Sequence, residues 1–362
     1  MPPLSIMIKP ASSLCNMRCE YCFYHDVTSL REVQNFGIMS KETASSLIEK
    51  ALAFADGESV AFAFQGGEPL FAGLDYFRFF VGEADRLNTK NSKIYYGLQT
   101  NGTLVNEEWA QFFKENNFLI GLSLDGDREN NRFRVKADGT NSYFDILEAT
   151  RHLKHYGVDF NILTVLTGNC AEHIEEIYRY FTRKGFKYLQ FIPCLRPFGD
   201  TSESELYMTP EQYAGFLIKG FNLYVKDYVR NDYTSVRYFD NLVHLYLGNP
   251  TEQCGICGHC MHQFVIEGNG NVYPCDFYCT DEHLLGNIGT DDFKSLAQSE
   301  KAIAFIKESL KIPEKCKKCT YYPLCRGGGC KRSREDRDYC EAYKAFFKAC
   351  LPLFRVFINE KK

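Results

Sequence analysis

Short apolar runs rich in β-branched and aromatic residues alternate along the chain with segments whose apolar positions recur every three or four residues. The runs predict strands over residues 4–9, 59–64, 93–98, 118–124, 159–166 and 188–193. Between them, Ser40 can cap a helix whose apolar positions are Ala44, Leu47, Ile48, Ala51 and Leu52, and residues 145–156 and 172–184 show the same period. Six strands alternating with five helices predict an α/β protein with a parallel sheet, open or curled into a partial TIM-like barrel. Its chemistry is expected in the loops that follow the strands.

The pattern changes after residue 193. Two helices are predicted over 210–229 and 236–247, followed by a hairpin of 263–267 and 271–274 with glycines at positive φ in its loop, Gly268-Asn269-Gly270. Beyond the hairpin the chain is loop-rich and dense in cysteine, which is typical of a small domain held by metal. We therefore expect a partial-barrel domain over residues 1–235 and a cysteine-rich domain with a C-terminal helix over 236–362.

Composition excludes several functional classes. The 362 residues are 45% hydrophobic, enough for one or two domains with a full core. The net charge of -4, from 46 acidic and 42 basic residues, offers no basic surface for nucleic acid or an anionic membrane. Prolines and a lysine interrupt the segment from Met1 to Leu14, where a signal peptide needs an unbroken apolar stretch. We expect a cytoplasmic protein that binds neither nucleic acid nor a membrane.

The chain contains 16 cysteines, of which three lie between residues 15 and 22 and ten between 254 and 340. Because the cytosol keeps thiols reduced, this clustering favours metal binding over disulfides. Cys15, Cys19 and Cys22 share one loop after the first predicted strand. Three thiolates on such a loop can hold three irons of a 4Fe-4S cluster and leave the fourth iron open. The alternative is a zinc site with a distant fourth ligand, for which His25 is the nearest candidate.

The Cys-x3-Cys-x2-Cys loop, the Phe23-Tyr24 that follows it and Gln65-Gly66-Gly67-Glu68-Pro69 after the second strand resemble the radical S-adenosylmethionine (SAM) enzymes. Two further motifs, Gln99-Thr100-Asn101-Gly102 and Ser123-Leu124-Asp125-Gly126, end the third and fourth strands, as in that family. The resemblance implies that the open iron binds the methionine part of SAM. It also implies contacts to SAM from Tyr24, Gly66, Gly67, Glu68, Ser123, Arg134 and Leu195, with Arg128 and Arg132 as neighbouring alternatives to Arg134.

The C-terminal cysteines resemble a SPASM domain, which carries two auxiliary 4Fe-4S clusters in peptide-modifying radical SAM enzymes. The resemblance implies one cluster on Cys254, Cys260, Cys275 and Cys330 and another on Cys316, Cys319, Cys325 and Cys340, and thus three clusters in all. A zinc ribbon is the alternative, with ligands Cys254, Cys257, Cys316 and Cys319. Free structural thiols are the default for the unassigned cysteines, Cys170, Cys194, Cys279 and Cys350.

The segment Tyr273-Pro274-Cys275-Asp276-Phe277-Tyr278 closely resembles the anaerobic sulfatase-maturating enzymes, and the similarity extends over nearly the whole chain. It implies oxidation of an active-site cysteine or serine of a sulfatase, in a Cys/Ser-x-Pro-x-Arg motif, to Cα-formylglycine. A 5'-deoxyadenosyl radical would remove a hydrogen from Cβ, Asp276 would take the thiol or hydroxyl proton as general base, and an auxiliary cluster would accept the electron. Tyr24 and Gln65 are expected to contact the target peptide. From its position alone, Asp276 could instead accept backbone hydrogen bonds.

The resemblance also implies a reducing electron donor and oxygen-poor conditions, and we expect a monomer. Two other hypotheses are open. A different SPASM-type maturase, for example one that forms thioether crosslinks, would use the same clusters, but the short segment before Cys15 is expected to leave no room for a leader-recognition domain. A second alternative is a non-enzymatic zinc-binding or electron-carrier protein. This hypothesis does not explain Gly66-Gly67-Glu68 or the six βα units.

Overall fold

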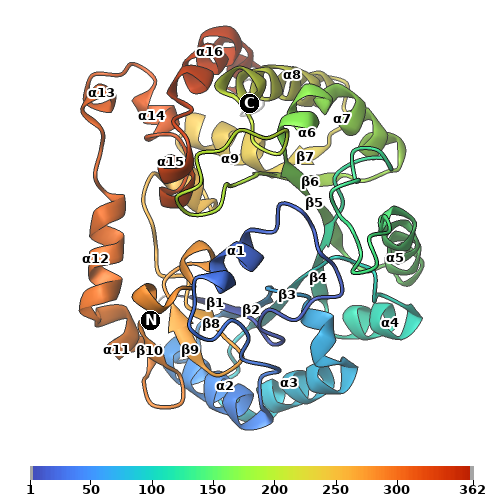
Figure 1. Ribbon diagram of the computed structural model, residues 1–362, viewed down its shortest axis with the longest axis vertical. Helices are drawn as coiled ribbons and strands as arrows, with labels where there is room; N and C mark the ends of the chain where they lie inside the picture. Colours follow the sequence, from blue (N-terminus) through green and yellow to red (C-terminus); the bar gives the residue numbers. More distant parts are fainter. Residues whose placement is uncertain (1–2, 359–362) are drawn as a thin grey trace. The chain divides into compact units, whose positions relative to one another are not determined.

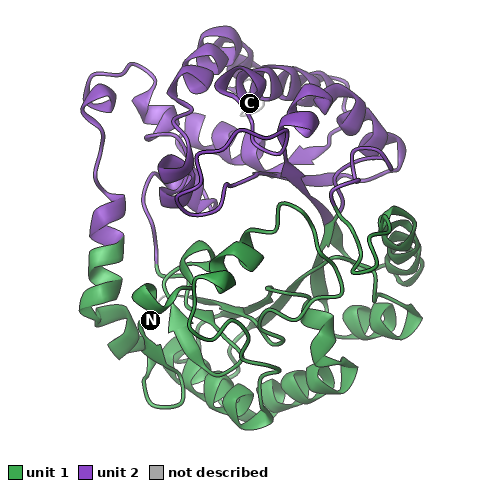
Figure 2. Ribbon diagram, in the orientation of Figure 1, with its two compact units in different colours: residues 1–123, 134–160, 262–305 green, residues 124–133, 161–261, 306–362 purple. Residues whose placement is uncertain are grey.

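The computed structural model describes residues 3–358 and divides into two compact units (Figure 2). The first unit comprises residues 1–123, 134–160 and 262–305, and the second comprises 124–133, 161–261 and 306–362. Both units are therefore assembled from segments that are distant in the sequence. Within residues 3–358, no helix is both long enough and apolar enough to cross a membrane.

The first unit is built on a sheet of short, apolar strands in the order β10-β9-β8-β1-β2-β3-β4 (Figure 1). From β8 to β4 the neighbouring strands are parallel. The strand bounds are Leu4–Ile8 (β1), Val60–Phe64 (β2), Ile94–Thr100 (β3), Phe118–Ser123 (β4), Val265–Ile266 (β8), Asn271–Tyr273 (β9) and Gly286–Asn287 (β10). The four strands predicted in the N-terminal part of this unit are thus confirmed, as is their parallel pairing.

Helices follow these strands, as the periodicity predicts. Ser40 caps α2 by accepting a hydrogen bond from the Thr43 amide at 3.1 Å, and the predicted apolar positions form the buried face of this helix. α2 packs beside α3 and against β1 and β2 (Figure 1). The helical elements of this unit are Phe23–Ser29 (α1), Lys41–Ala55 (α2), Pro69–Ala72 (η1), Leu74–Leu87 (α3), Glu107–Glu115 (α4), Tyr143–Tyr156 (α5), Asp276–Tyr278 (η2), Asp281–His283 (η3) and Phe293–Gln298 (α11).

The predicted hairpin forms, but its two glycines serve different purposes. β8 and β9 are antiparallel, and Gly270 adopts a positive φ of 86° in the loop between them. Gly268 is not among the described residues with positive φ, which corrects that part of the prediction. A Cβ at Gly268 would lie 2.6 Å from the carbonyl oxygen of Gly37. Close packing on another loop therefore explains this glycine.

The second unit continues the alternation with the parallel strands β5, β6 and β7. Its helix α8 packs against α6, α7 and the C-terminal helix α16, where the rings of Tyr213 and Tyr339 lie 4.7 Å apart. Helix α12 (Glu300–Ser309) runs from the first unit into the second. The other elements are Phe160–Leu166 (β5), Gly168–Glu172 (α6), Ile174–Arg183 (α7), Tyr188–Pro193 (β6), Pro210–Val229 (α8), Ser235–Val236 (β7), Arg237–Tyr246 (α9), Cys254–Cys257 (α10), Glu314–Lys317 (α13), Tyr322–Cys325 (α14), Lys331–Asp336 (α15), Cys340–Cys350 (α16) and Leu351–Ile358 (η4).

An aromatic cluster fills the core between the first unit's sheet and helix α3. The ring of Phe64 lies edge-on to the rings of Phe77 and Phe80, with centroids 4.9 and 5.0 Å away. Phe64 is 1% exposed and is the last residue of β2. Because the next residues form the Gln-Gly-Gly-Glu motif, this packing fixes the point from which that motif leaves the sheet.

We expect Phe64→Ala to lower the free energy of unfolding by about 3–5 kcal/mol, because it removes a buried ring and leaves a cavity. Urea unfolding of the reduced protein, followed by circular dichroism, measures this loss. Tyr95→Ala is the matched control, since Tyr95 is 48% exposed and should change the midpoint little. A loss below about 1 kcal/mol would mean that the sheet does not depend on this ring.

Candidate active site

Three cysteines lie on the loop between β1 and α1, as the sequence predicts. Cys15 and Cys22 are exposed and Cys19 is half-buried. The sulfur of Cys15 accepts hydrogen bonds from the amide of Met17 at 3.4 Å and from the side-chain amide of Asn101 at 3.8 Å. Although Cys15 is exposed as a residue, loss of hydration around its sulfur raises the pKa of Cys15 to about 11, and the charge of Glu68 also raises it. A thiolate here therefore needs a positive partner, which a metal centre would supply.

The Gly66-Gly67 pair packs tightly against two other parts of this site. Gly66 has a φ of 97°, and a Cβ there would lie 2.7 Å from Cγ of Lys9. Gly67 has a φ of 48°, and a Cβ there would lie 2.3 Å from the carbonyl oxygen of Leu14. The two glycines thus let the end of β2 pass close to Lys9 and to the start of the cysteine loop.

Glu68 is fully buried and binds the ends of neighbouring loops. Its carboxylate accepts hydrogen bonds from the hydroxyl of Thr100 and the amide of Asn101, both at 2.8 Å, and from the amide of Leu70 at 3.1 Å. Burial raises its pKa to about 7, although these hydrogen bonds lower it. Glu68 therefore ties the Gly-Gly-Glu-Pro turn to the end of β3. Its contact with SAM stays a prediction.

Neighbouring parallel strands bring Lys9, Gln65 and Glu267 to one edge of the sheet. Ile8 of β1 lies in register with Phe64 of β2 and with Ile266 of β8. The residues that follow these three positions are Lys9, Gln65 and Glu267. Carboxyl ends of parallel strands are where α/β proteins place their chemistry. These side chains are thus brought together by register, although they are far apart in the sequence.

Asp276 joins this group from η2, directly after the hairpin. Its Oδ1 accepts a hydrogen bond from Nζ of Lys9 at 2.5 Å, and its Oδ2 accepts one from the side-chain amide of Gln65 at 2.6 Å. Lys9 is 0% exposed and Asp276 is 5% exposed. Burial alone would lower the pKa of Lys9, but the charges of Asp276 and Glu267 raise it above its ordinary value. The structure therefore places the predicted base beside the predicted substrate-contact residue Gln65.

Tyr24 is buried in the same cluster. Its hydroxyl donates a hydrogen bond to Glu267, and Nζ of Lys9 lies 3.8 Å from the centre of its ring. Glu267 also forms a fully buried ion pair with Arg31 at 2.7 Å. Burial, followed by the charge of Glu267, raises the pKa of Tyr24 well above its ordinary value. Tyr24 is therefore a neutral hydrogen-bond donor that is fixed in place by the hairpin.

The rest of the predicted SAM contacts divide between the two units. Ser123 ends β4 and is 5% exposed, and Arg134 is 6% exposed with its guanidinium 5.4 Å from the ring centre of Tyr21. Leu195 belongs to the second unit, where it is buried after β6. Of the alternatives to Arg134, Arg132 forms an ion pair with Glu205 at 2.8 Å within the second unit. The SAM contacts of all these residues stay predictions.

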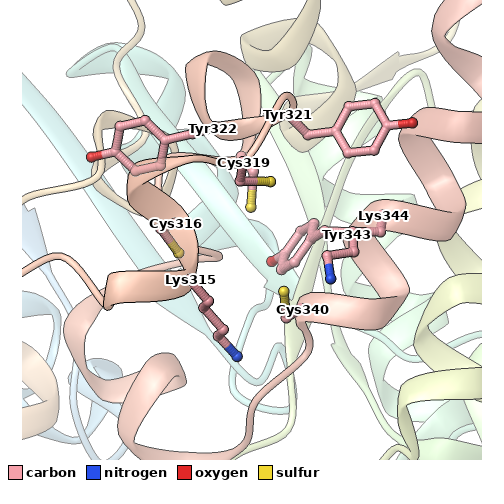
Figure 3. Close-up of a pocket in the computed structure, with 9 residues that line it drawn as sticks. Lys315, Cys316, Cys319, Tyr321, Tyr322, Cys340, Tyr343 and Lys344 are labelled. Atoms are coloured by element: carbon pink, nitrogen blue, oxygen red, sulfur yellow. The ribbon is translucent and has the colours of Figure 1, made fainter.

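Four cysteines of the second unit line one pocket, namely Cys316, Cys319, Cys325 and Cys340 (Figure 3). The other residues that line this pocket are Lys315, Tyr321, Tyr322, Tyr343 and Lys344. This is the grouping predicted for the second auxiliary cluster. Neither Cys254 nor Cys257 is among the described residues that line this pocket, so the geometry does not assemble the alternative zinc ribbon.

Three of the ligands predicted for the other auxiliary cluster lie near one another in the second unit. Burial raises the pKa of Cys254 to about 12, and the nearby thiols of Cys330, Cys260 and Cys257 also raise it. Cys257 contacts the hydroxyl of Thr251 at 3.3 Å. The fourth predicted ligand, Cys275, belongs to the first unit. Its place in this ligand set stays a prediction.

The donor sets fit iron–sulfur clusters better than they fit other cofactors. Each predicted group consists of thiols alone, and cysteine thiolates are the ligands that hold 4Fe-4S clusters in proteins. Amide groups that donate to the sulfur of Cys15 are the kind of hydrogen bond that tunes such a cluster. Within residues 3–358, no three His, Cys, Asp or Glu side chains are arranged to surround a single metal ion.

The sequence motifs did not indicate the buried charged residues around Asp276, which are Lys9, Arg31 and Glu267. Each is fully or almost fully buried and has its partner in a distant segment of the chain. One signal was available, because Lys9 directly follows an apolar strand at the edge where chemistry is expected. The partners themselves depend on tertiary packing.

Comparisons with known proteins agree with this geometry. Residues 10–181 match the Radical SAM superfamily, and residues 251–320 match SPASM, an iron-sulfur cluster-binding domain. The cysteine-type anaerobic sulfatase-maturating enzyme of Clostridium perfringens (strain 13 / Type A) is 46% identical over 361 residues, which cover 97% of this chain and 97% of the relative. The serine-type anaerobic sulfatase-maturating enzyme of Bacteroides thetaiotaomicron is 29% identical over 376 residues, which cover 97% and 90%.

A solved structure is also similar over the full length. It is described as native anSMEcpe with bound AdoMet and Cp18Cys peptide. Its TM-score to this chain is 0.94 at 42% identity, and the match covers 100% of both chains.

We expect Gly67→Ala to displace the cysteine loop, because the new Cβ would lie 2.3 Å from a Leu14 oxygen that has little room to move. A strained backbone of this kind costs about 1–3 kcal/mol, so SAM should bind roughly tenfold more weakly or worse. Equilibrium dialysis of SAM with the anaerobically reconstituted protein measures the change. Gly82→Ala is the control, since a Cβ there meets nothing within 4 Å.

Glu68 should make the unfolding free energy of the cofactor-free, reduced protein depend on pH. Burial raises its pKa from 4.5 to about 7, so between these values the folded chain holds a proton that the unfolded chain has released. The contribution of Glu68 to the free energy of unfolding is therefore largest below pH 4.5. It decreases as pH rises toward 7, by at most about 3 kcal/mol. Urea midpoints across this range should show a smaller decline in Glu68→Gln than in the unchanged protein. Equal slopes would contradict this, and the exposed Glu58→Gln serves as control.

Proposed function

This chain belongs to the anaerobic sulfatase-maturating enzymes, and we propose that it oxidises a cysteine of its target sulfatase with Asp276 as the general base. The predicted fold class, a radical SAM partial barrel with a SPASM domain, is confirmed by the matched domains. The chain is accordingly an oxidoreductase that converts a cysteine or serine of sulfatases to Cα-formylglycine, with SAM and three 4Fe-4S clusters as cofactors. Membership of this family sets aside the zinc-protein hypothesis and disfavours a thioether-forming maturase.

A preference for cysteine over serine is supported by the relatives. The chain is much more similar to the cysteine-type enzyme than to the serine-type enzyme over the same length. A peptide with a cysteine in the Cys-x-Pro-x-Arg motif is therefore the proposed substrate. A peptide with serine at that position is the natural comparison.

The observation that carries the proposed role of Asp276 is its pair of contacts. One carboxylate oxygen meets the buried ammonium of Lys9, and the other meets Gln65, which is half-buried. A general base must be ionised and within hydrogen-bond reach of the proton that it removes. The ammonium of Lys9 lies beside Oδ1, and Gln65 lies beside Oδ2, the oxygen that a substrate thiol would reach.

When bound, SAM and the clusters supply the radical that removes hydrogen from Cβ and the acceptor for the electron that follows. The chain's own residues do the rest. Asp276 accepts the thiol proton at Oδ2, Gln65 orients the thiol through its side-chain amide, and the ring of Tyr24 closes the buried side of the site. The walls of this cluster exclude water, because Lys9, Tyr24 and Asp276 are all buried.

Several further features of the function remain proposals. We propose that a reducing electron donor supplies electrons to the enzyme, that the enzyme acts as a monomer and that it works in the cytoplasm. The cytoplasm is proposed because cysteines that bind metal must stay reduced. The domain boundary at residue 235 is proposed on the sequence pattern, and the cluster ligand sets are proposed on the sequence resemblance.

Paired peptides that differ only in cysteine or serine at the target position test the proposal. Each is incubated anaerobically with reconstituted enzyme, SAM and a reductant, and the aldehyde is measured by mass spectrometry. We expect faster conversion of the cysteine peptide, and a loss of about 10²–10⁴-fold in Asp276→Asn, which keeps the shape but cannot accept the proton. Full activity of Asp276→Asn would refute the base role. Faster conversion of the serine peptide would refute only the cysteine preference.

A further inference from the structure

Lys9 stands out because a fully buried lysine is rare and costly. Its side chain is 0% exposed at the carboxyl end of β1, and its charge is balanced by Asp276, which lies 267 residues further along the chain. Burying an ammonium without a partner costs several kcal/mol, so the fold depends on Asp276 to offset the charge of Lys9. A well-packed apolar side chain would fill the same space at a lower free-energy cost.

The surroundings of Lys9 hold its ammonium in one place. The aliphatic part passes under Gly66, where any Cβ would lie 2.7 Å from Cγ and 2.8 Å from Nζ. The ring of Tyr24 covers Nζ at 3.8 Å. The backbone amide of Lys9 is also fixed, since it donates to the carbonyl of Ile266 at 2.8 Å. Little rotation of the side chain is possible in this packing.

The two oxygens of Asp276 have different environments as a result. Oδ1 faces the buried ammonium of Lys9, whereas Oδ2 faces the half-buried side chain of Gln65. Because Lys9 holds Oδ1 by a buried, charge-assisted hydrogen bond, the carboxylate cannot easily turn about its own axis. Oδ2 is thus the oxygen that remains available when a peptide displaces or shares the Gln65 contact.

We propose that Lys9 is a positioning residue of the oxidation: it holds Asp276 by Oδ1 so that Oδ2 faces the substrate thiol. This inference rests on the proposed role of Asp276 as the base. After hydrogen is removed from Cβ, the substrate radical loses the S–H proton to Oδ2 and one electron to the acceptor of the established reaction, and a C=S bond forms. Hydrolysis then gives the aldehyde. Lys9 neither gains nor loses a proton in this step.

A purely structural role for Lys9 predicts different behaviour. If the ion pair only stabilised the fold, its loss would weaken peptide binding, hydrogen abstraction and aldehyde formation together. A positioning role affects the step after hydrogen abstraction. The ratio of aldehyde formed to 5'-deoxyadenosine formed separates the two cases, and a cysteine peptide deuterated at Cβ reports abstraction directly as deuterium in 5'-deoxyadenosine.

The test compares Lys9→Met, Asp276→Asn and the double variant. We expect Lys9→Met to bind the peptide with an unchanged Kd by fluorescence anisotropy, and to transfer deuterium normally. Its ratio of aldehyde to 5'-deoxyadenosine should fall at least tenfold. Lys50→Met is the matched control, because Lys50 is a partly buried lysine of the same unit that donates to the carbonyl oxygens of Ile288 and Asp291. Its ratio should not change.

The double variant shows whether Lys9 acts through Asp276. If it does, Lys9→Met/Asp276→Asn loses no more than Asp276→Asn alone, since residues that act as a unit are not additive. Additive losses would overturn the inference, as would a parallel loss of abstraction and aldehyde in Lys9→Met. A normal ratio in Asp276→Asn would refute the proposed base. A defect in Asp276→Asn with a normal ratio in Lys9→Met would refute only the role of Lys9.

Should Lys9→Met fold poorly, Lys9→Ala with added ethylammonium gives the same information. The small cation can enter the space left by the side chain and approach Oδ1. Restoration of the ratio in Lys9→Ala, but not in Asp276→Asn, would support positioning by a cation. A Lys9→Ala protein that binds the peptide normally and is not restored would overturn it.

Discussion

The register of three parallel strands is the constraint on which the site depends. Ile8 lies between Phe64 and Ile266, so β2, β1 and β8 end at the same level. Buried positions alternate with more exposed ones along β1 and β2, so the buried face of each strand fixes the register in which the strands end. A slip of one residue in any of these strands would reverse the direction of its side chains and separate the group around Lys9. The apolar residues of the strands therefore specify the site as strictly as the polar ones.

Two buried ion pairs connect this edge to the surrounding loops. Lys9 holds Asp276, and Arg31 holds Glu267, which in turn accepts a hydrogen bond from Tyr24. Pairs of this kind contribute little net stability, because each charge must be stripped of water. What they provide is one defined arrangement. The ion pairs thereby hold the helix that follows the cysteine loop against the segment of the hairpin and Asp276, beside the ring contact of Phe23 with Phe277.

Sequence patterns predicted much of this architecture. The six main strands and the Ser40 cap were evident from alternation and periodicity, because local propensity and burial agree there. The grouping of Gln65 with Asp276 was implied only by family resemblance. Gly268 was assigned a turn conformation although it is required by the close approach of another loop. The Lys9 pair was not foreseen, since nothing local to residue 9 indicates a partner near residue 276. Contacts of that kind follow from packing between distant segments.

The discontinuity of the first unit has a consequence for modularity. Strands β8, β9 and β10 come from residues 262–305, yet they extend the sheet that β1 begins. A chimera that joined the N-terminal part of this chain, up to Ser235, to the C-terminal part of a distant relative would replace one edge of its own sheet. Such an exchange would transplant Glu267 and Asp276 along with the cysteines, and the new hairpin would have to match Lys9, Tyr24 and Arg31. The cysteine-rich segment and the barrel segment are therefore expected to evolve together, because an exchange of one without the other would break their shared contacts.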